Sequence, residues 1–504
     1  MTRTEPMERL RRLAHMASRV PAPPSISRRA FLTAASALPA LAGKAPNLDV
    51  AIVGAGLAGL VCADQLKRKG LNAALYDAAP RAGGRCFSLR GFFPGQVAER
   101  GGELIDNLHK TMIGYAREFG LTLENIIKNP GDVRYFFNGQ VYPESAVVDE
   151  YRAFVPAMRE DLRRLSKEVT AASFTAYDEQ IDRLSLEEYL ATRGAAPLIR
   201  AVIEQAYIAE YGLALARQSA LNFLFFIHAD RRSKFRPFGV FSDERYHVVE
   251  GNDAIASGLA ARLAGQIRPG VTLRAVRKTA AGRIELTLRE GARTVTATHD
   301  AVVLAIPFST LRGVQLDASL GLSQSKLAAI RNLGYGTNAK MMVGFNSRPW
   351  LALHGSNGSS YSDLPNHQAT WETNPINATP ARAILTDYSG AERGARLNPS
   401  RVQLEASRFL ADLDRVYPGA HAAATRDARG NFLVHLEHWP SNPLSQGSYT
   451  CYLPGQFTTI AGLEGEPAGN LFFAGEHTNS FYEWQGFMEG ACLSGVAAAK
   501  QILA

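Results

Sequence analysis

Residues 49–59 read DVAIVGAGLAG, an apolar run of strand length that passes directly into three spaced glycines. A helical pattern follows over residues 60–69, and a second strand is predicted over residues 72–76, just before Asp77. A GxGxxG turn between a strand and a helix, with an acid about 20 residues further on, is typical of a dinucleotide-binding unit. The sequence therefore predicts an α/β fold of the Rossmann type.

The three glycines have separate tasks in this prediction. Gly54 permits the tight turn, Gly56 lets a pyrophosphate approach the backbone, and Gly59 lets the helix pack against the strand. The helix N-terminus offers unpaired N–H groups and a favourable dipole to the phosphates. The Asp77 carboxylate can accept a hydrogen bond from a ribose 2′-hydroxyl, which favours an unphosphorylated ribose. Both FAD and NAD use such a unit, so these residues alone leave the cofactor open.

The first 42 residues have the features of an export signal. Arg28 and Arg29 precede a short apolar run over residues 33–41, and an A-x-A pattern closes the segment at residues 40–42. This order resembles a twin-arginine signal, and the apolar run is too short to span a bilayer. We expect residues 1–42 to be removed on export to the periplasm or an equivalent compartment, leaving no stable membrane anchor. An amphipathic helix with an accidental arginine pair is the alternative.

Composition argues against several classes of protein. The chain has 504 residues and is 46% hydrophobic, which excludes a disordered tail or a small disulfide-stapled protein. Residues 1–42 contribute +5 of the formal net charge of +8, and no basic block follows, so we expect no nucleic-acid partner. The scattered cysteines predict neither a metal site nor a disulfide, but small buried side chains. They are Cys62, Cys86, Cys451 and Cys492.

Further segments resemble the flavin-containing amine oxidase family. Residues 81–85 read RAGGR shortly after the dinucleotide unit, and residues 99–103 read ERGGE. Residues 470–477 (NLFFAGEH) predict a strand ending in Gly-Glu, and residues 484–491 (WQGFMEGA) open a helix rich in small residues. The resemblance spans residues 48–504 and implies FAD as the cofactor.

The resemblance also implies which residues bind the cofactor. The backbone of Val276 is expected to lie against the adenine, and Glu476 to bind the ribityl or phosphate region. The helix N-terminus near Met488 is expected to point at the flavin and stabilise negative charge there. Ser448 stands where some members carry a cysteine bonded to the flavin, which implies non-covalent FAD. The expected cofactor-binding set is Gly54, Gly56, Gly59, Asp77, Arg81, Gly83, Gly84, Arg85, Val276, Gly475, Glu476 and Met488.

Three residues are expected to take part in catalysis. Lys340 lies in a mostly apolar strand pattern, where a charge needs a reason, and the family places a lysine in this context, bridged by water to flavin N5. A lysine that reaches solvent from an edge strand is the alternative. Tyr449 and Phe487 match the family's aromatic pair, which would bind an uncharged amine and orient its C–H bond, although both types are common in cores.

The resemblance predicts a Rossmann-type FAD-binding domain built from three chain segments, with an interleaved α+β substrate-binding domain. The implied reaction is oxidation of an amine, with oxygen or an electron carrier as acceptor; assembly as a homodimer is left open. The expected FAD-binding segments are residues 48–121, 246–315 and 439–504, and the expected substrate-domain segments are residues 122–245 and 316–438.

Alternative functions remain open. An L-amino acid oxidase needs a cation for the substrate carboxylate, often shortly after the matching glycine pair, where Glu103 stands here. That counts against an amino acid, but another arginine could serve. A desaturase-type C–C oxidase needs neither the Lys340 context nor the aromatic pair. A flavin-binding scaffold without turnover would keep its flavin oxidised with every amine. The candidate carboxylate-binding arginines are Arg231, Arg232 and Arg236.

Overall fold

The computed structural model describes residues 48–227, 242–376, 382–479 and 484–504. Residues Asn47–Ala504 form one compact unit. The predicted export signal and the candidate carboxylate-binding arginines lie outside the described residues. In the part of the chain that the structure describes, no helix combines the length and apolar character needed to cross a membrane.

A five-stranded parallel sheet contains the first predicted strand, in the order β20-β13-β1-β2-β9. β1 (Val50–Val53) lies in register between β13 (Ala301–Leu304) and β2 (Ala73–Asp77). β20 (Leu471–Phe473) and β9 (Ile267–Pro269) complete the sheet on either side. Every residue of β1 and β13 is buried, as expected for parallel strands covered on both faces. The predicted α/β fold is therefore confirmed.

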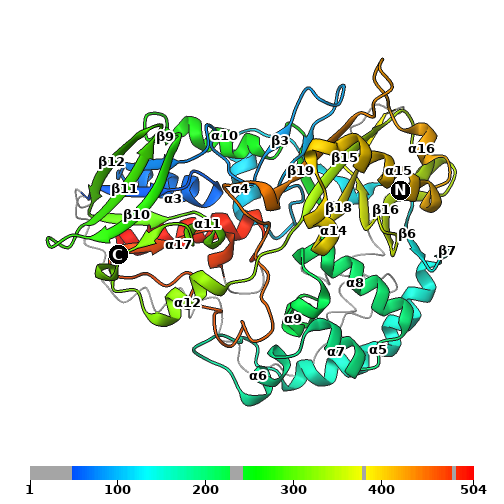
Figure 1. Cartoon of the computed structure of the whole chain (residues 1–504), viewed down its shortest axis with the longest axis horizontal. Coiled ribbons are helices and arrows are strands. Elements are labelled where there is room, and N and C mark those ends of the chain that lie inside the picture. Colours follow the sequence, from blue (N-terminus) through cyan, green and yellow to red (C-terminus); the bar gives the residue numbers. More distant parts are fainter. Residues whose placement is uncertain (1–47, 228–241, 377–381, 480–483) are drawn as a thin grey trace, which may run out of the picture. The chain divides into compact units, whose positions relative to one another are not determined.

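Helices from both ends of the chain pack beside this sheet. α3 (Leu57–Lys67) connects β1 to β2 and packs against the C-terminal helix α17 (Met488–Leu503). The two helices approach closely because Gly495 has no side chain: a Cβ there would lie 2.3 Å from the Ala58 carbonyl oxygen. α10 (Asp253–Arg262) also contacts α3, and Figure 1 shows these helices beside the parallel sheet.

A smaller, mainly antiparallel sheet contains Val276. β10 (Val271–Lys278) pairs with β11 (Ile284–Glu290), which pairs with β12 (Arg293–His299). β14 (Gln315–Leu316) adds a parallel edge to β10. Burial alternates along most of β11, so one face of this sheet packs on the core.

A seven-stranded sheet, in the order β19-β15-β18-β17-β16-β6-β7, brings together two distant parts of the chain. β15 (Ala339–Phe345) lies between β18 (Ala383–Ser389) and β19 (Val434–His438), and all seven of its residues are buried. Lys340 is therefore not on an edge strand, and the alternative of a lysine that reaches solvent is wrong. The other strands are β6 (Asp132–Phe137), β7 (Gln140–Tyr142), β16 (Ser356–Ser362) and β17 (Ala369–Glu372).

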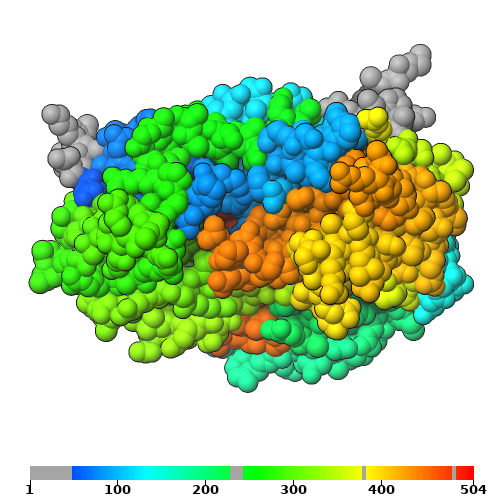
Figure 2. Space-filling view, turned by 45° about the horizontal axis from the view of Figure 1, so that its top comes forward, coloured from blue at the N-terminus to red at the C-terminus, as the bar shows by residue number. Residues whose placement is uncertain are grey.

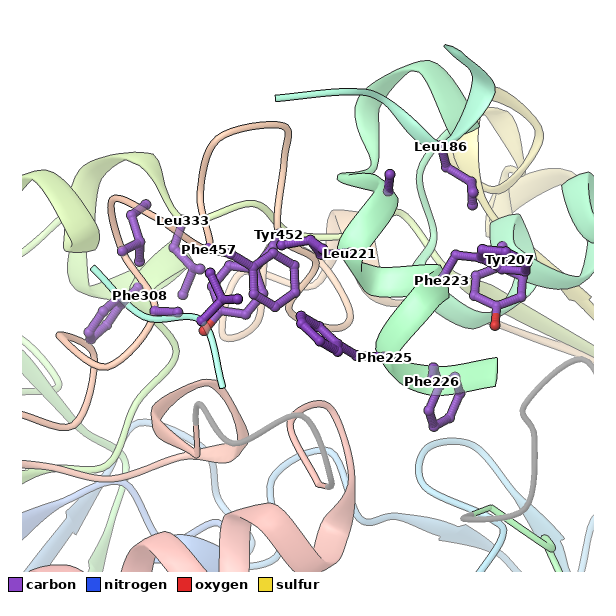
Figure 3. Close-up of a cluster of buried hydrophobic side chains, with 14 of the residues drawn as sticks. Leu186, Tyr207, Leu221, Phe223, Phe225, Phe226, Phe308, Leu333, Tyr452 and Phe457 are labelled. Carbon is purple, nitrogen blue, oxygen red and sulfur yellow. The ribbon is translucent and has the colours of Figure 1, made fainter. Parts of the chain in front are cut away.

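A group of helices packs against the seven-stranded sheet through α8 (Pro197–Tyr211). α9 (Ala220–Ile227) is apolar on almost every side and all its residues are buried, as expected for such a helix. Figure 3 shows Phe223 of α9 beside Tyr207, and Phe225 beside Phe457. Four further helices are α5 (Glu144–Arg164), α7 (Leu186–Thr192), α12 (Gln324–Asn332) and α15 (Val402–Val416).

The remaining elements are short or connect the sheets. All four cysteines are buried free thiols, so their predicted burial is confirmed. The shorter helices are α4 (Lys110–Glu118), α6 (Ala176–Asp182), α11 (Phe308–Leu311), α13 (Pro349–Ala352), α14 (Ala391–Arg396) and α16 (Ala420–Ala423). The remaining strands are β3 (Ser88–Leu89) with β4 (Ala98–Glu99), and β5 (Leu123–Asn125) with β8 (Tyr246–Val248).

Segments far apart in the sequence meet where the two larger sheets approach each other. Arg100 forms an ion pair with Glu437, and its carbonyl oxygen accepts a hydrogen bond from the Trp439 ring at 3.0 Å. Figure 2 shows early (blue) and late (orange) parts of the chain side by side at the surface. The sheets follow the predicted order of interleaved segments; the segment boundaries themselves stay a prediction.

Candidate active site

A cavity of about 1110 Å³ extends from the glycine turn after β1 to the seven-stranded sheet. All three expected catalytic residues, Lys340, Tyr449 and Phe487, line it. Most of the expected cofactor-binding residues line the same cavity, so one continuous space serves both groups. These are Gly54, Gly56, Asp77, Arg81, Gly83, Gly84, Arg85, Gly475, Glu476 and Met488.

Two expected cofactor residues do not line the cavity. A Cβ on Gly59 would lie 1.9 Å from the Gly54 carbonyl oxygen, so Gly59 allows the helix to pack on the turn, as predicted. Val276 is fully buried in β10, and this strand reaches the cavity through residues 271–274 instead. A contact between the Val276 backbone and the adenine therefore stays a prediction.

The glycine turn and the RAGGR segment form one wall. The Gly83 N–H donates a hydrogen bond to the Ala55 carbonyl at 2.8 Å, and a Cβ on Gly84 would lie 3.2 Å from the Gly56 Cα. Gly54 adopts φ +107°, where a Cβ would lie 2.4 Å from the Ala305 carbonyl oxygen. A Cβ on Gly56, by contrast, would meet nothing within 4 Å. This open space against bare backbone fits a pyrophosphate at the N-terminus of α3.

Asp77 closes the turn from the end of β2. Its carboxylate accepts hydrogen bonds from the N–H groups of Ala55 at 2.5 Å and Ala79 at 2.7 Å. Burial raises the pKa of this carboxyl, although both N–H groups act in the opposite direction. A carboxylate has acceptor capacity beyond two hydrogen bonds, so a ribose hydroxyl can still be accommodated. Its contact with ribose stays a prediction.

The second half of the RAGGR segment is tied to the C-terminal Gly-Glu motif. Arg85 donates to the Glu476 carboxylate at 2.8 Å, joining residues 391 positions apart. Glu476 also accepts hydrogen bonds from the Thr450 hydroxyl at 3.2 Å and the Gly486 N–H at 3.1 Å. The sequence identified Arg85 and Glu476 separately, but it did not reveal that they pair.

α17 begins at the cavity wall. Phe487 is its N-cap and makes no side-chain capping bond, so the first N–H groups of the helix have no side-chain partner there. Met488 packs over Gly102, where a Cβ would lie 2.8 Å from the methionine sulfur. The helix dipole at this end favours negative charge in the adjacent part of the cavity. This placement fits the predicted role of the helix toward a flavin.

Lys340 is held by three acceptors. Its ammonium donates to the carbonyl oxygens of Glu99 at 2.7 Å and Gly101 at 3.1 Å, and to the Glu103 carboxylate at 2.5 Å. The other Glu103 oxygen accepts a hydrogen bond from the Trp371 ring at 2.9 Å. An ammonium has three N–H donors, so a water-bridged contact with a flavin would require the release of one acceptor. That contact stays a prediction, and Glu103 is the partner that sequence reasoning missed.

Tyr449 and Phe487 both line the cavity, and both come from the C-terminal part of the chain. Phe487 is the residue directly before α17. The Phe487 ring contacts the rings of His109 at 5.4 Å and Phe226 at 6.2 Å between centroids. The Tyr449 ring lies against Gly486, where a Cβ would be 2.7 Å away. The structure thus brings both rings to one cavity; their arrangement as a facing pair around a substrate stays a prediction.

Sequence reasoning missed the acidic side chains of the cavity. Glu210, near the end of α8, lines the cavity with Tyr449, and burial raises the pKa of its carboxyl to about 7. Glu244 also lines the cavity, and burial followed by the negative charge of Glu210 raises its pKa well above the usual range. The two glutamates lie far apart in the sequence and share no local motif, so only the fold reveals that they meet.

The comparisons of this chain with known proteins agree on one family. The family profile described as flavin containing amine oxidoreductase matches residues 57–503. The flavin-dependent L-tryptophan oxidase RebO of Lentzea aerocolonigenes is 27% identical over 90% of this chain and 97% of its own length. The L-amino-acid oxidase of Naja atra is 22% identical over 90% of this chain and 87% of its own. The structure of cyclohexylamine oxidase from Brevibacterium oxydans IH-35A matches with a TM-score of 0.75 and 19% identity, covering 91% of this chain and 99% of that one.

Proposed function

Because this chain belongs to the family of flavin containing amine oxidoreductases, and is an FAD-dependent enzyme that oxidises the CH–NH bond of its donor, we propose that the donor is an amine without an α-carboxylate. Its relatives include oxidases named for amino acids, and its structural neighbours include oxidases named for amines. Family membership therefore leaves the substrate class open, and support for the proposal comes from the charges on the cavity wall.

The supporting observation is that four of the five described lysines and arginines of the wall already have partners. Lys340 is paired with Glu103 at 2.5 Å, and Arg85 with Glu476 at 2.8 Å. Arg100 is paired with Glu437, and Arg81 donates to the Gly84 carbonyl at 2.6 Å. The remaining wall arginine, Arg274, is exposed on β10, a strand that contacts β2 and so lies at the Asp77 end of the cavity. A substrate carboxylate beside Tyr449 and Phe487 would lie in a cavity whose wall also carries acids. An unpaired buried charge of this kind is costly.

FAD held by the glycine turn and the Arg85–Glu476 pair would supply the acceptor for a hydride from the α-carbon of the amine, and the imine so formed would react with water to give a carbonyl compound and the released amine or ammonia. The chain's own contribution is placement. Tyr449 and Phe487 offer apolar ring surface to the donor, and the Tyr449 ring packs against the backbone of Gly486, which helps to fix its orientation. Oxygen or an electron carrier accepts the electrons in the second half of the cycle.

The test of this proposal compares an amine with its own carboxylated form. Pentylamine should reduce the flavin at least roughly tenfold faster than L-norleucine at equal low concentration, because an unpaired carboxylate in the cavity costs about 1.4 kcal/mol or more. Anaerobic bleaching of the flavin absorbance measures both rates, with D-norleucine as a control for non-specific reduction. Faster bleaching by L-norleucine would reject the proposal and favour an L-amino acid oxidase.

We also propose that the FAD is held without a covalent bond. Ser448 lines the cavity, and its hydroxyl cannot form the thioether that a cysteine at this position makes in some members of the family. Precipitating the protein with acid should therefore leave yellow FAD in the supernatant, measured by absorbance and fluorescence. A washed pellet that keeps the yellow colour would show a covalent link at another residue.

Export through the twin-arginine route is a further part of the proposal, and it rests on the N-terminal sequence alone. Changing Arg28 and Arg29 to lysine should retain the precursor in the cytoplasm, because the export receptor reads the guanidinium pair. The chain offers a matched control in its other arginine pair, Arg11 and Arg12, whose change to lysine should leave export intact. Fractionation followed by immunoblotting measures the outcome. Full export of the first variant would reject this route.

A further inference from the structure

The N-termini of two helices meet behind the cavity wall. α17 begins at the wall with Met488, and α4 lies against it (Figure 1). The Glu489 carboxylate, in the first turn of α17, accepts hydrogen bonds from the N–H groups of Thr111 at 2.8 Å and Met112 at 2.9 Å. These groups belong to the first turn of α4, where N–H groups have no partner within the helix. Glu489 therefore caps the neighbouring helix.

The Glu489 carboxylate serves α4 rather than the helix that carries it. A carboxylate in a first turn usually stabilises the N-terminus of its own helix. Here Glu489 is 2% exposed and both of its carboxylate oxygens accept hydrogen bonds from α4. Met488 and Ala491, three residues apart on another face of α17, line the cavity instead. Burial raises the pKa of the Glu489 carboxyl, and the N–H groups of Met112 and Thr111 oppose that shift.

His109 connects this cap to the cavity wall. It is the N-cap residue of α4 and makes no side-chain capping bond, so the Glu489 carboxylate takes that role. The His109 ring is fully buried, and its Nδ1 accepts a hydrogen bond from the Asp106 N–H at 3.0 Å. Its centroid lies 5.4 Å from that of the Phe487 ring and 4.6 Å from that of the Trp484 ring, edge to face with both. Burial lowers the pKa of His109 to about 3, so a neutral ring makes these contacts.

The contacts form a closed cycle. Phe487 and Glu489 are two residues apart in the chain, and Glu489 holds the start of α4. His109 leads directly into α4, and its ring returns to Phe487. Because Phe487 precedes α17 and makes no capping bond, its orientation depends on the rings around it. Edge-to-face contacts have a preferred geometry, so a shift of His109 would displace the Phe487 ring.

We propose that Glu489 is a positioning residue: by capping α4 it places His109, and His109 holds the Phe487 ring at the cavity wall. Glu489 thus acts through other side chains and not by contact with the donor. The inference rests on the proposed function in one respect, because there the Phe487 ring contacts the donor. A displaced ring changes the orientation of the donor, and a displacement of about 1 Å can slow a reaction roughly 100-fold.

The test uses the holoenzyme and matched variants. In Glu489→Ala the limiting rate of anaerobic flavin reduction by pentylamine should fall at least about tenfold, with a much smaller change in the Kd of the amine. Glu489→Gln should recover most of the rate, because its amide oxygen still accepts an N–H group. Glu150→Ala is the control, since Glu150 of α5 caps α8 in the same way, accepting from the Ile199 N–H at 2.8 Å. Neither residue of this second cap lines the cavity, so the rate should stay unchanged.

Hydrogen exchange measures the positioning without turnover. Loss of the cap in Glu489→Ala should speed amide exchange at Thr111 and Met112. Residues 484–488 should exchange faster as well, because His109 joins the two segments. His109→Ala removes the ring and leaves the cap. It should therefore slow flavin reduction as Glu489→Ala does, without faster exchange at Thr111 and Met112.

The outcomes separate this inference from the proposed function. Wild-type rates of flavin reduction in both Glu489→Ala and His109→Ala would overturn the inference, and so would faster exchange in Glu489→Ala that is confined to α4. FAD content and circular dichroism check that each variant is folded; if Glu489→Ala does not fold, His109→Ala alone decides through its rate. Faster reduction of the wild-type enzyme by L-norleucine than by pentylamine would instead reject the proposed function, and the variants would then be compared with L-norleucine as the donor.

Discussion

Replacing Lys340 by methionine is expected to lower the free energy of unfolding by about 3–5 kcal/mol and to slow reoxidation of the reduced enzyme by oxygen by up to about 100- to 1000-fold. The first effect follows because the Glu103 carboxylate, which is 6% exposed, loses its charged partner at 2.5 Å. The second rests on the predicted water-bridged contact of the Lys340 ammonium with flavin N5, from which a positive charge would stabilise the negative charge that develops on oxygen. Anaerobic reduction by substrate should change much less.

A double variant separates the two effects. Lys340→Met with Glu103→Gln removes both charges, so most of the lost stability should return, since no unpaired carboxylate remains. Reoxidation should stay slow, because the positive charge is still absent. Urea unfolding measures the first effect and stopped-flow spectroscopy the second. Recovery of the reoxidation rate in the double variant would mean that Lys340 acts by neutralising Glu103 and not as a positive charge toward oxygen.

The parts of the site that the sequence predicted are those defined by local backbone geometry. Gly54 must adopt a positive φ and Gly59 must let a helix approach a strand, and both requirements are visible in a spacing of six residues. The strand β1 could also be predicted, because a strand that is buried on both faces reads as a continuous apolar run in the sequence. Such features depend on neighbours in the sequence, so a single chain is enough to find them.

The parts that the sequence did not predict depend on partners across the fold. Lys340 was found as a charge in an apolar strand, but its pairing with Glu103 joins residues 237 positions apart. In the sequence, Glu103 stood out only because it occupies a position where amino acid oxidases often carry an arginine. Glu210 reads as the polar residue of an ordinary helix, and Glu244 as part of a loop, so nothing local marks either as a wall of the cavity. Their chemistry arises from burial and from each other, which only the tertiary structure supplies.

Valine in place of Gly56 is expected to produce a folded protein that binds FAD poorly. Gly56 has φ −70° and ψ 179°, which any residue can adopt, and a Cβ there would meet nothing within 4 Å. The apoprotein should therefore lose no more than about 1 kcal/mol, mostly through the poorer N-cap of α3. The added side chain would instead occupy the space expected for the pyrophosphate.

Overpacking of this kind costs about 1–3 kcal/mol, so the Kd for FAD should rise roughly 5- to 150-fold. Gly59→Ala is the matched control: its Cβ would lie 1.9 Å from the Gly54 carbonyl oxygen, so it should destabilise the apoprotein itself. Fluorescence titration of each apoprotein with FAD gives the Kd, and circular dichroism with urea unfolding gives the stability without cofactor. Tight FAD binding by Gly56→Val would move the pyrophosphate away from this turn, whereas an unfolded Gly56→Val apoprotein would show that the space beside Gly56 is needed by the chain itself.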